Sequence, residues 1–322
     1  MKLTKLLLPR IAALIAGASL APHAIAQSYP AKPVRIVVGF AIGGGTDTLA
    51  RLLSKHLAGM WGQAMVIDSR PGADGAISTE ITAKSPPDGY TIVMISNAHT
   101  ITPFQRKLAY DPVKDFAPVT LVASTPNLLL VHPSLPVKSV KELVTLAKSK
   151  PGALTFGSSG AGTSPYLAME LLKSMAGIEL AHVPYKGSGQ AVIDLVGGHI
   201  QVMFGAISTT LQFAKQGKVR ALAVSSRARV TSVPDMMTVA EAGFPGFEAS
   251  TWYGVLAPAR TPADIVQKLH ADIAVVMQLP EVKTYLAATG FDAVANTPTE
   301  FAEVIRTDMA KWGKILSKLP AS

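Results

Sequence analysis

Short runs of apolar, often β-branched residues alternate with helical stretches along most of the chain. Residues 34–38 form the first run, and the segment 47–60 carries leucines on one helical face, at the spacing i, i+3, i+4 and i+8. Further apolar runs predict strands at 65–67, 90–95, 127–131, 154–156, 181–183, 202–204 and 221–224. This alternation is typical of an α/β fold with mostly parallel sheets flanked by helices.

Capping residues mark the starts of three later helices. Ser139 is followed three residues on by Glu142, which is the spacing of a capping box. Segments 261–264 and 297–300 each place a threonine as the cap, a proline at the first helical position and an acid in the first turn. We therefore expect one helix after Ser139 and two long helices at the end of the chain.

The first 26 residues have the pattern of a signal peptide. Basic residues precede an uncharged apolar run, and Ala24-Ile25-Ala26 supplies the small residues that a signal peptidase reads. We expect cleavage after Ala26 and export to the periplasm. No later segment reaches the roughly 20 consecutive apolar residues of a membrane span, so we expect the mature protein to be soluble.

Charge and cysteine content narrow the classes of partner and chemistry. The formal net charge is +9, but the basic residues are scattered along the chain, which argues against a nucleic-acid surface. A mild positive field suits the capture of small anions, although a charge surplus that only aids solubility explains the number equally well. The absence of cysteine excludes disulfides, thiolate metal sites and a cysteine nucleophile.

A glycine-rich loop, residues 43–47, follows the first strand and opens the first helix. Glycines let a ligand approach the backbone closely, and the free N–H groups of a helix start favour an anion. A dinucleotide site is a weaker alternative: Thr48 replaces the third glycine of that fingerprint, although Asp68 lies where its ribose-binding acid would be. A tight turn that binds no ligand also remains open.

A second loop, residues 157–165, repeats this arrangement after the strand at 154–156. Its glycines are joined by four hydroxyl-bearing residues, and Ser164 followed by Pro165 predicts the cap and first residue of another helix. Two anion-receptive helix starts, one in each half of the chain, predict a ligand with two negative ends that is held across a cleft.

Patterns for catalysis and metal binding are absent from the sequence. No Gly-x-Ser-x-Gly elbow occurs, because Ser159 has Gly157 before it but Ala161 in place of the second glycine. The histidines of the mature chain fall outside the spacings of metal ligands. We expect no catalytic residue, no metal and no cofactor; only the serine-rich loops keep a periplasmic hydrolase open as an alternative.

Several short motifs stand in order along nearly the whole mature chain. Besides the two glycine-rich loops they include Arg70-Pro71-Gly72-Ala73, Pro87-Asp88-Gly89-Tyr90-Thr91, Tyr110-Asp111-Pro112, Val183-Pro184-Tyr185-Lys186-Gly187 and Thr238-Val239-Ala240-Glu241-Ala242-Gly243. Each motif alone is weak, but the ordered set is specific. With them the chain resembles the Bug or TctC family, the extracytoplasmic solute receptors of tripartite tricarboxylate transporters (TTT).

The resemblance implies a two-domain periplasmic-binding-protein (Venus-flytrap) fold, with one domain at 27–125 plus 252–322 and the other at 126–251. It implies a monomeric receptor that is not an enzyme and captures a small di- or tricarboxylate, aromatic ones such as terephthalate included. Capture would use backbone amides, hydroxyl groups and bridging waters, and delivery would be to integral-membrane subunits of a TTT permease. The sequence does not separate this receptor from one that serves a two-component sensor kinase.

The resemblance also implies the ligand-binding residues. Carried over position by position, they are Phe40, Ala41, Gly43, Gly44, Asp47, Ser96, Ser158, Gly162, Thr163, Ser164, Tyr185 and Gly205. Two positions depart from the family pattern: Gly39 stands where many relatives have proline, and Gly205 where many have aspartate or another polar residue. The missing side chain at Gly205 would leave room for a bulkier ligand, which favours an aliphatic or aromatic dicarboxylate over an amino acid.

Overall fold

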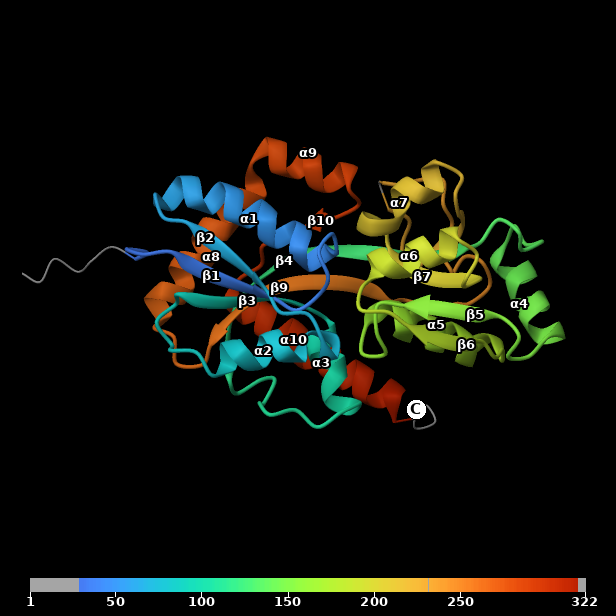
Figure 1. The fold of residues 1–322 in the computed structure, drawn as a ribbon, viewed down its shortest axis with the longest axis horizontal. Coiled ribbons are helices and arrows are strands. Elements are labelled where there is room, and N and C mark those ends of the chain that lie inside the picture. Colours follow the sequence, from blue (N-terminus) through green and yellow to red (C-terminus); the bar gives the residue numbers. More distant parts are fainter. Residues whose placement is uncertain (1–28, 231, 318–322) are drawn as a thin grey trace, which may run out of the picture. The chain divides into compact units, whose positions relative to one another are not determined.

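Ten strands form one sheet in the computed structural model, which describes residues 29–230 and 232–317 (Figure 1). The strands are β1 (Val34–Val38), β2 (Met65–Ser69), β3 (Thr91–Ser96), β4 (Phe116–Val131), β5 (Thr155–Ser158), β6 (Ala181–Pro184), β7 (Val202–Ala206), β8 (Arg220–Val224), β9 (Ser250–Pro258) and β10 (Asp292–Ala293). The helices are α1 (Gly45–Trp61), α2 (Ala76–Ala83), α3 (Ala98–Ile101), α4 (Val140–Ser149), α5 (Ser164–Ala176), α6 (Ser188–Val196), α7 (Ile207–Lys215), α8 (Ala263–Gln278), α9 (Pro280–Ala288) and α10 (Pro298–Leu316), with short 3-10 turns at η1 (Ala73–Gly75) and η2 (Thr102–Phe104).

The sheet is mixed, with parallel strands on either side of an antiparallel centre. β1 pairs in parallel with β2 and β3, and β5 pairs in parallel with β6 and β7. Between these groups β9 runs antiparallel to β3 and β4, and β4 runs antiparallel to β7, β8 and β10. The α/β class is therefore confirmed, but the sheet is mixed and not mostly parallel, because its central strands β4 and β9 pair antiparallel with their neighbours.

Strand β4 is much longer than the run predicted at 127–131. Its first part, residues 116–126, pairs with β9, and its last part pairs with β7 and β8. The apolar pattern predicts neither residues 116–126 nor β9, because Pro118 and Pro126 interrupt the first of them and proline is unusual inside a sheet. Strand β4 thus joins the two groups of parallel strands.

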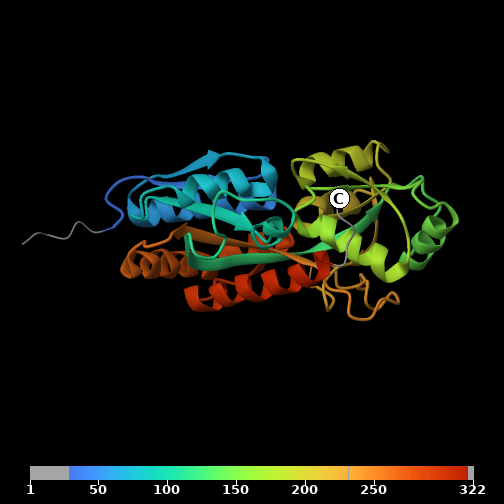
Figure 2. The same ribbon diagram turned by 90° about the horizontal axis from the view of Figure 1, so that it is seen from below.

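The C-terminal helix α10 contributes to two hydrophobic clusters. Phe301 and Ile305 pack in a cluster with Val37 of β1. Trp312, further along the same helix and 1 % exposed, belongs to the cluster that contains Leu129 of β4. Figure 2 shows α10 lying along β4, as the contacts between these two elements require. One amphipathic helix therefore braces both parts of the sheet.

The structure does not test the predicted boundaries of the leader and of the two domains. Residues from Lys32 onward form one compact unit, and the division into 27–125 plus 252–322 and 126–251 stays a prediction. The expected cleavage after Ala26 lies outside the described residues. Among the described helices, none combines the length and the apolar character that crossing a bilayer requires.

Of the three caps predicted for the helices that follow residues 139, 261 and 297, two are confirmed. The Ser139 hydroxyl accepts from the N–H of Glu142 at 3.2 Å, and the Thr297 hydroxyl caps α10 in the same way. The cap at Thr261 is wrong: its hydroxyl donates to the carbonyl of Pro258 at 2.7 Å, and α8 begins two residues later. The short α9 between the last two long helices was not marked by any cap.

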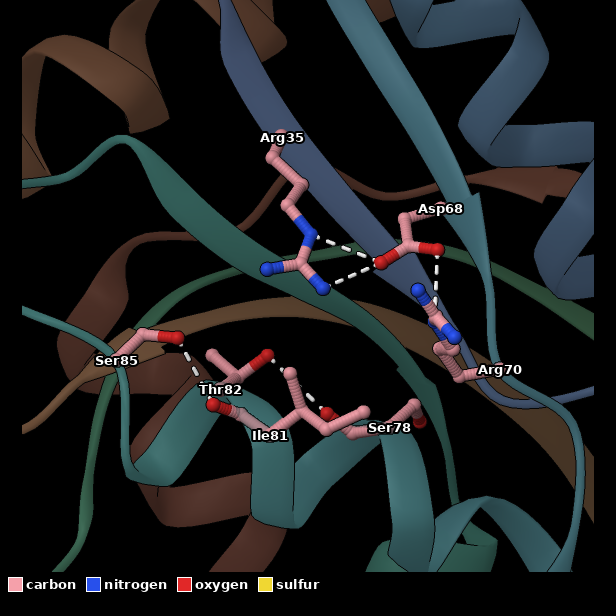
Figure 3. Close-up of polar contacts among 7 residues, drawn as sticks. All are labelled: Arg35, Asp68, Arg70, Ser78, Ile81, Thr82 and Ser85. Carbon is pink, nitrogen blue, oxygen red and sulfur yellow. Dashed lines mark hydrogen bonds and ion pairs between the residues drawn. The ribbon is translucent and has the colours of Figure 1, made fainter.

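Asp68, the acid of the dinucleotide alternative, is held by two arginines (Figure 3). Its carboxylate accepts from Nε of Arg35 on β1 and from Nε of Arg70, each at 2.9 Å. Below it in Figure 3, the Ser85 hydroxyl donates to the backbone of α2. Because Asp68 is engaged by the protein itself, the dinucleotide alternative gains no support.

Candidate functional site

Four helices begin around one cavity. Helices α1, α5, α6 and α7 start directly after Gly44, Thr163, Gly187 and Ala206, and each of these four residues lines the cavity. Within the described part of the chain, no side chain caps any of the four starts. The first N–H groups of an uncapped helix lack intrahelical partners and carry a partial positive charge, so the cavity is suited to an anion.

The cavity encloses about 420 Å³ that protein atoms do not fill, part of it open to solvent. Its lining is drawn from both halves of the chain and consists of Phe40, Gly44, Gly45, Thr46, Ser96, Asn97, Ser159, Thr163, Ser164, Pro165, Gly187, Ser188, Ala206, Thr251 and Tyr253. None of these described lining residues carries a charge. An anion bound here would be held by backbone dipoles and neutral donors.

Close packing against β9 shapes the first glycine-rich loop. A methyl carbon on Gly45 would overlap the hydroxyl group of Tyr253, so a larger residue here would have to displace Tyr253. The Asp47 carboxylate is buried and accepts from the N–H of Gly43 at 3.0 Å and from Nε of Arg51 at 2.9 Å. Asp47 therefore braces the loop, and it is not among the residues that line the cavity.

Two buried polar atoms of the cavity residues have no hydrogen-bond partner among the described residues. They are Oγ1 of Thr46, which is 2 % exposed, and Oδ1 of Asn97, which is 1 % exposed. Buried polar groups in folded proteins are almost always paired. The two atoms therefore indicate a polar ligand or ordered water in the cavity.

Hydroxyl groups of the second loop bond mainly to the protein. The Thr163 hydroxyl donates to the carbonyl of Gly160 at 2.7 Å, and the Ser164 hydroxyl donates to the carbonyl of Ser250 at 3.1 Å. Helix α5 begins at Ser164 with Thr163 as its N-cap, so the predicted cap lies one residue too late. The second loop therefore contributes the start of α5 to the cavity, while the hydroxyl groups of Thr163 and Ser164 are already bonded to the protein.

Side chains from the first half of the chain hold the second loop. Nε2 of Gln105 donates to the carbonyl of Ala161 at 2.7 Å, and the Asp74 carboxylate accepts from the N–H of Gly162. Nη2 of Arg106 donates to Asp74 Oδ2 at 2.8 Å. Burial raises the pKa of Asp74, although Arg106 and the Gly162 N–H act in the opposite direction. No sequence pattern marked any of these three side chains.

The structure brings some of the predicted binding residues to the cavity. Those that line it are Phe40, Gly44, Ser96, Thr163 and Ser164. Ala41 and Gly43 line a neighbouring groove that shares Gly44, Gly187 and Ser188 with the cavity. The first loop therefore faces both the cavity and this groove.

Tyr185 and Gly205 do not line the cavity. The Tyr185 hydroxyl donates to Asp194 Oδ2 at 2.6 Å, and burial together with that carboxylate raises the pKa of Tyr185 to about 12. A methyl carbon on Gly205 would lie 2.6 Å from Cγ2 of Thr210. Gly205 therefore faces packed side chains, and the room for a bulkier ligand that we expected from it is not found there.

Sequence reasoning missed several residues of the lining. Gly45 and Thr46 lie in the loop that it recognised, and Asn97 directly follows Ser96, so a local signal existed for them. Gly187 and Ser188 lie at the end of a family motif and at the start of α6. Thr251 and Tyr253 had no signal, since they lie on β9, which the apolar pattern does not predict.

Ser158 lies beside His182, with Oγ 2.7 Å from Nε2. Ser158 is fully buried and does not line the cavity, and burial together with Lys173 lowers the pKa of His182 to about 4. A catalytic serine must reach its substrate, so this pair does not support a hydrolase. In the described ranges no cluster of three or more histidine or acidic residues could hold a metal ion.

Comparison with known proteins finds close relatives. Residues 49–320 match the family model described as "Tripartite tricarboxylate transporter family receptor" (TctC). Among solved structures, the chain is similar to the R. palustris protein Rpa4515 with adipate: 36 % identity, a TM-score of 0.87, and coverage of 90 % of this chain and 97 % of that one. The TM-score with the periplasmic binding protein BugD is 0.85, at 31 % identity over 90 % of this chain and 98 % of BugD.

The chain is about as similar to MatC (Rpa3494) from Rhodopseudomonas palustris with bound malate as it is to BugD. The identity is 32 %, the TM-score is 0.85, and the match covers 89 % of this chain and all of MatC (100 %). These likenesses confirm the periplasmic-binding-protein fold that the sequence motifs imply.

Proposed function

This chain belongs to the tripartite tricarboxylate transporter receptor family, and we propose that it binds a small di- or tricarboxylate in the cavity at the four helix starts. The family consists of periplasmic solute-binding receptors rather than enzymes. One observation carries the proposal: four uncapped helix N-termini line a cavity whose described lining contains no charged side chain.

The energies of such a site are sufficient for a receptor. Micromolar affinity needs about 8 kcal/mol. A helix terminus contributes about 0.3–1 and at most ~2 kcal/mol per anion, while a hydrogen bond to a charged group contributes about 1.5–3 kcal/mol. Helix dipoles alone fall short, so N–H groups and the free Thr46 hydroxyl supply most of the remainder.

The distribution of the helix starts supports a ligand with two charged ends. Helix α1 begins in the first glycine-rich loop, whereas α5, α6 and α7 begin between residues 163 and 207. In the proposed receptor these two groups belong to the two domains, and the ligand lies in the cleft between them. The adipate of Rpa4515 and the malate of MatC are both dicarboxylates, which agrees with this proposal.

A thermal-shift screen followed by calorimetric titration tests the binding of carboxylates. A ligand at 100 times its Kd adds about 2.7 kcal/mol to the free energy of unfolding, which corresponds to a Tm increase of several degrees at roughly 2–4 °C per kcal/mol. We expect dicarboxylates to give this shift, and neutral amides of the same acids to give none. Binding of the amides as tightly as the acids would contradict the proposal.

The proposal includes export and delivery. The leader would be removed after Ala26, and the monomeric receptor would pass its ligand to the integral-membrane subunits of a TTT permease. Intact mass of the protein recovered from the periplasm should correspond to a start at Gln27. Uptake of the labelled ligand should fall when the receptor gene is deleted; unchanged uptake would contradict the transport role.

A further inference from the structure

Asn97 follows β3 and has all but one of its hydrogen-bonding groups engaged by the protein. Its backbone N–H donates to Trp252 O at 3.1 Å, its carbonyl accepts from the N–H of Thr100 at 3.1 Å, and Nδ2 donates to Ser250 O at 3.1 Å. Oδ1 is the exception, since it is buried and has no partner among the described residues. Asn97 lines the cavity, and Oδ1 is the acceptor of its side chain that the protein leaves unpaired.

The orientation of this amide follows from its other contact. Rotating the side-chain amide by half a turn would place Oδ1 against the carbonyl oxygen of Ser250, where two acceptors would repel each other. The bond from Nδ2 to Ser250 therefore determines that the unpaired atom is the oxygen. A carboxylate oxygen, which is also only an acceptor, cannot satisfy it.

The rest of the cavity provides donors. Four helix starts present N–H groups, and the other unpaired buried atom of the lining is the hydroxyl of Thr46. Hydroxyls of Ser159, Thr163 and Thr251 already donate to protein oxygens. A ligand that fits the cavity thus has acceptors at its ends and one donor that reaches Asn97.

We propose that Asn97 Oδ1 selects carboxylate ligands that carry a hydroxyl group, which makes the ligand of this receptor a hydroxy-dicarboxylate. A hydroxyl group can donate to Oδ1, whereas a methylene group leaves the buried acceptor unpaired. An ammonium group is a poorer donor here, because the helix starts carry positive partial charge and no described lining residue is acidic. This inference rests on the proposed carboxylate function.

Matched ligand pairs test the inference. We expect malate to bind at least tenfold more tightly than succinate, and 2-hydroxyglutarate at least tenfold more tightly than glutarate, in calorimetric titration. In Asn97→Leu, which keeps a similar volume but removes the acceptor, the ratio of the two Kd values should fall toward one. In the control Thr46→Val, both members of each pair should weaken together and the ratio should persist.

Each result of this experiment decides a separate point. Equal affinity of wild type for the members of each pair overturns the inference even if Asn97→Leu does not fold, since a water would then satisfy Oδ1. A preference that persists in Asn97→Leu also overturns it, because another group would be responsible. If none of the four acids binds but another di- or tricarboxylate from the screen does, the inference fails and the proposed function stands. If no di- or tricarboxylate binds, both fail.

Discussion

Gly160 of the second loop lies so close to Asp74 of the η1 turn that a methyl carbon on Gly160 would overlap Asp74 Oδ1. The two residues lie far apart along the chain. The same carboxylate accepts from the N–H of Gly162, and Arg106 pairs with it from the first half. The position of the second loop, and with it the start of α5 at the cavity, therefore depends on this contact.

We predict that Gly160→Ala lowers ligand affinity at least tenfold, because the loop must move away from Asp74 and carry the start of α5 with it. Gly152→Ala is the matched control, since Gly152 also has a positive φ (+72°) but faces open space. Each variant should lose about 1–3 kcal/mol of folding free energy through backbone strain. Calorimetric titration and urea unfolding separate the two effects; equal affinities of the two variants would contradict the role of the contact.

The hydroxyl group of Thr46 should be a ligand donor. Thr46→Val keeps the shape of the side chain and removes the unpaired hydroxyl, so we expect a loss of about 1.5–3 kcal/mol of binding free energy with a charged ligand. Thr48→Val, two residues further along α1, is the control and should bind normally, since Thr48 does not line the cavity. Calorimetry on both variants with the best dicarboxylate checks this, and an unchanged Kd for Thr46→Val would exclude the contact.

Gly254 of β9 should be essential for the packing of α10. A methyl carbon there would overlap the ring of Phe301, which is fully buried, so Gly254→Ala should lower the free energy of unfolding by about 1–3 kcal/mol. Gly59→Ala adds the same methyl group in α1, where no atom lies within 4 Å, and should raise stability by up to about 1 kcal/mol. Urea unfolding of the two variants measures the change in the free energy of unfolding for each. A stabilising effect of Gly254→Ala would contradict its packing against Phe301.

Acid should destabilise the fold through its buried histidines. Burial lowers the pKa of His99 to about 4, although the Pro112 carbonyl acts in the opposite direction. The unfolded chain therefore binds more protons between about pH 6.5 and 4, and stability falls as the pH decreases through this window. His99→Gln should reduce the slope of unfolding free energy against pH, by at most about 1.4 kcal/mol per pH unit. His56→Gln on α1 serves as the control, and equal slopes in both variants would contradict the assignment.

The sequence alone was sufficient for the features whose causes are local. The apolar runs predict most of the strands. The two glycine-rich loops indicate the starts of α1 and α5, because glycine, a cap and an amphipathic stretch stand next to each other. The ordered motifs led to the family and its fold. Phe40 and Gly44 lie in the loop between β1 and α1, and Ser96 is the last residue of β3, so these cavity residues lie next to strands that the apolar pattern predicts.

Only the tertiary structure decided which atoms remain free for a ligand. Asp47 and Tyr185 are predicted binding residues that do not line the cavity: the N–H of Gly43 donates to the Asp47 carboxylate, and the Tyr185 hydroxyl donates to Asp194 on α6. Asn97 did not stand out, and its importance comes from a bond to Ser250, more than 150 residues away (|i−j| = 153), which leaves Oδ1 unpaired. Hydrogen-bond partners and burial depend on segments that are distant in sequence, so residue type and spacing do not reveal which donors and acceptors a fold leaves unsatisfied.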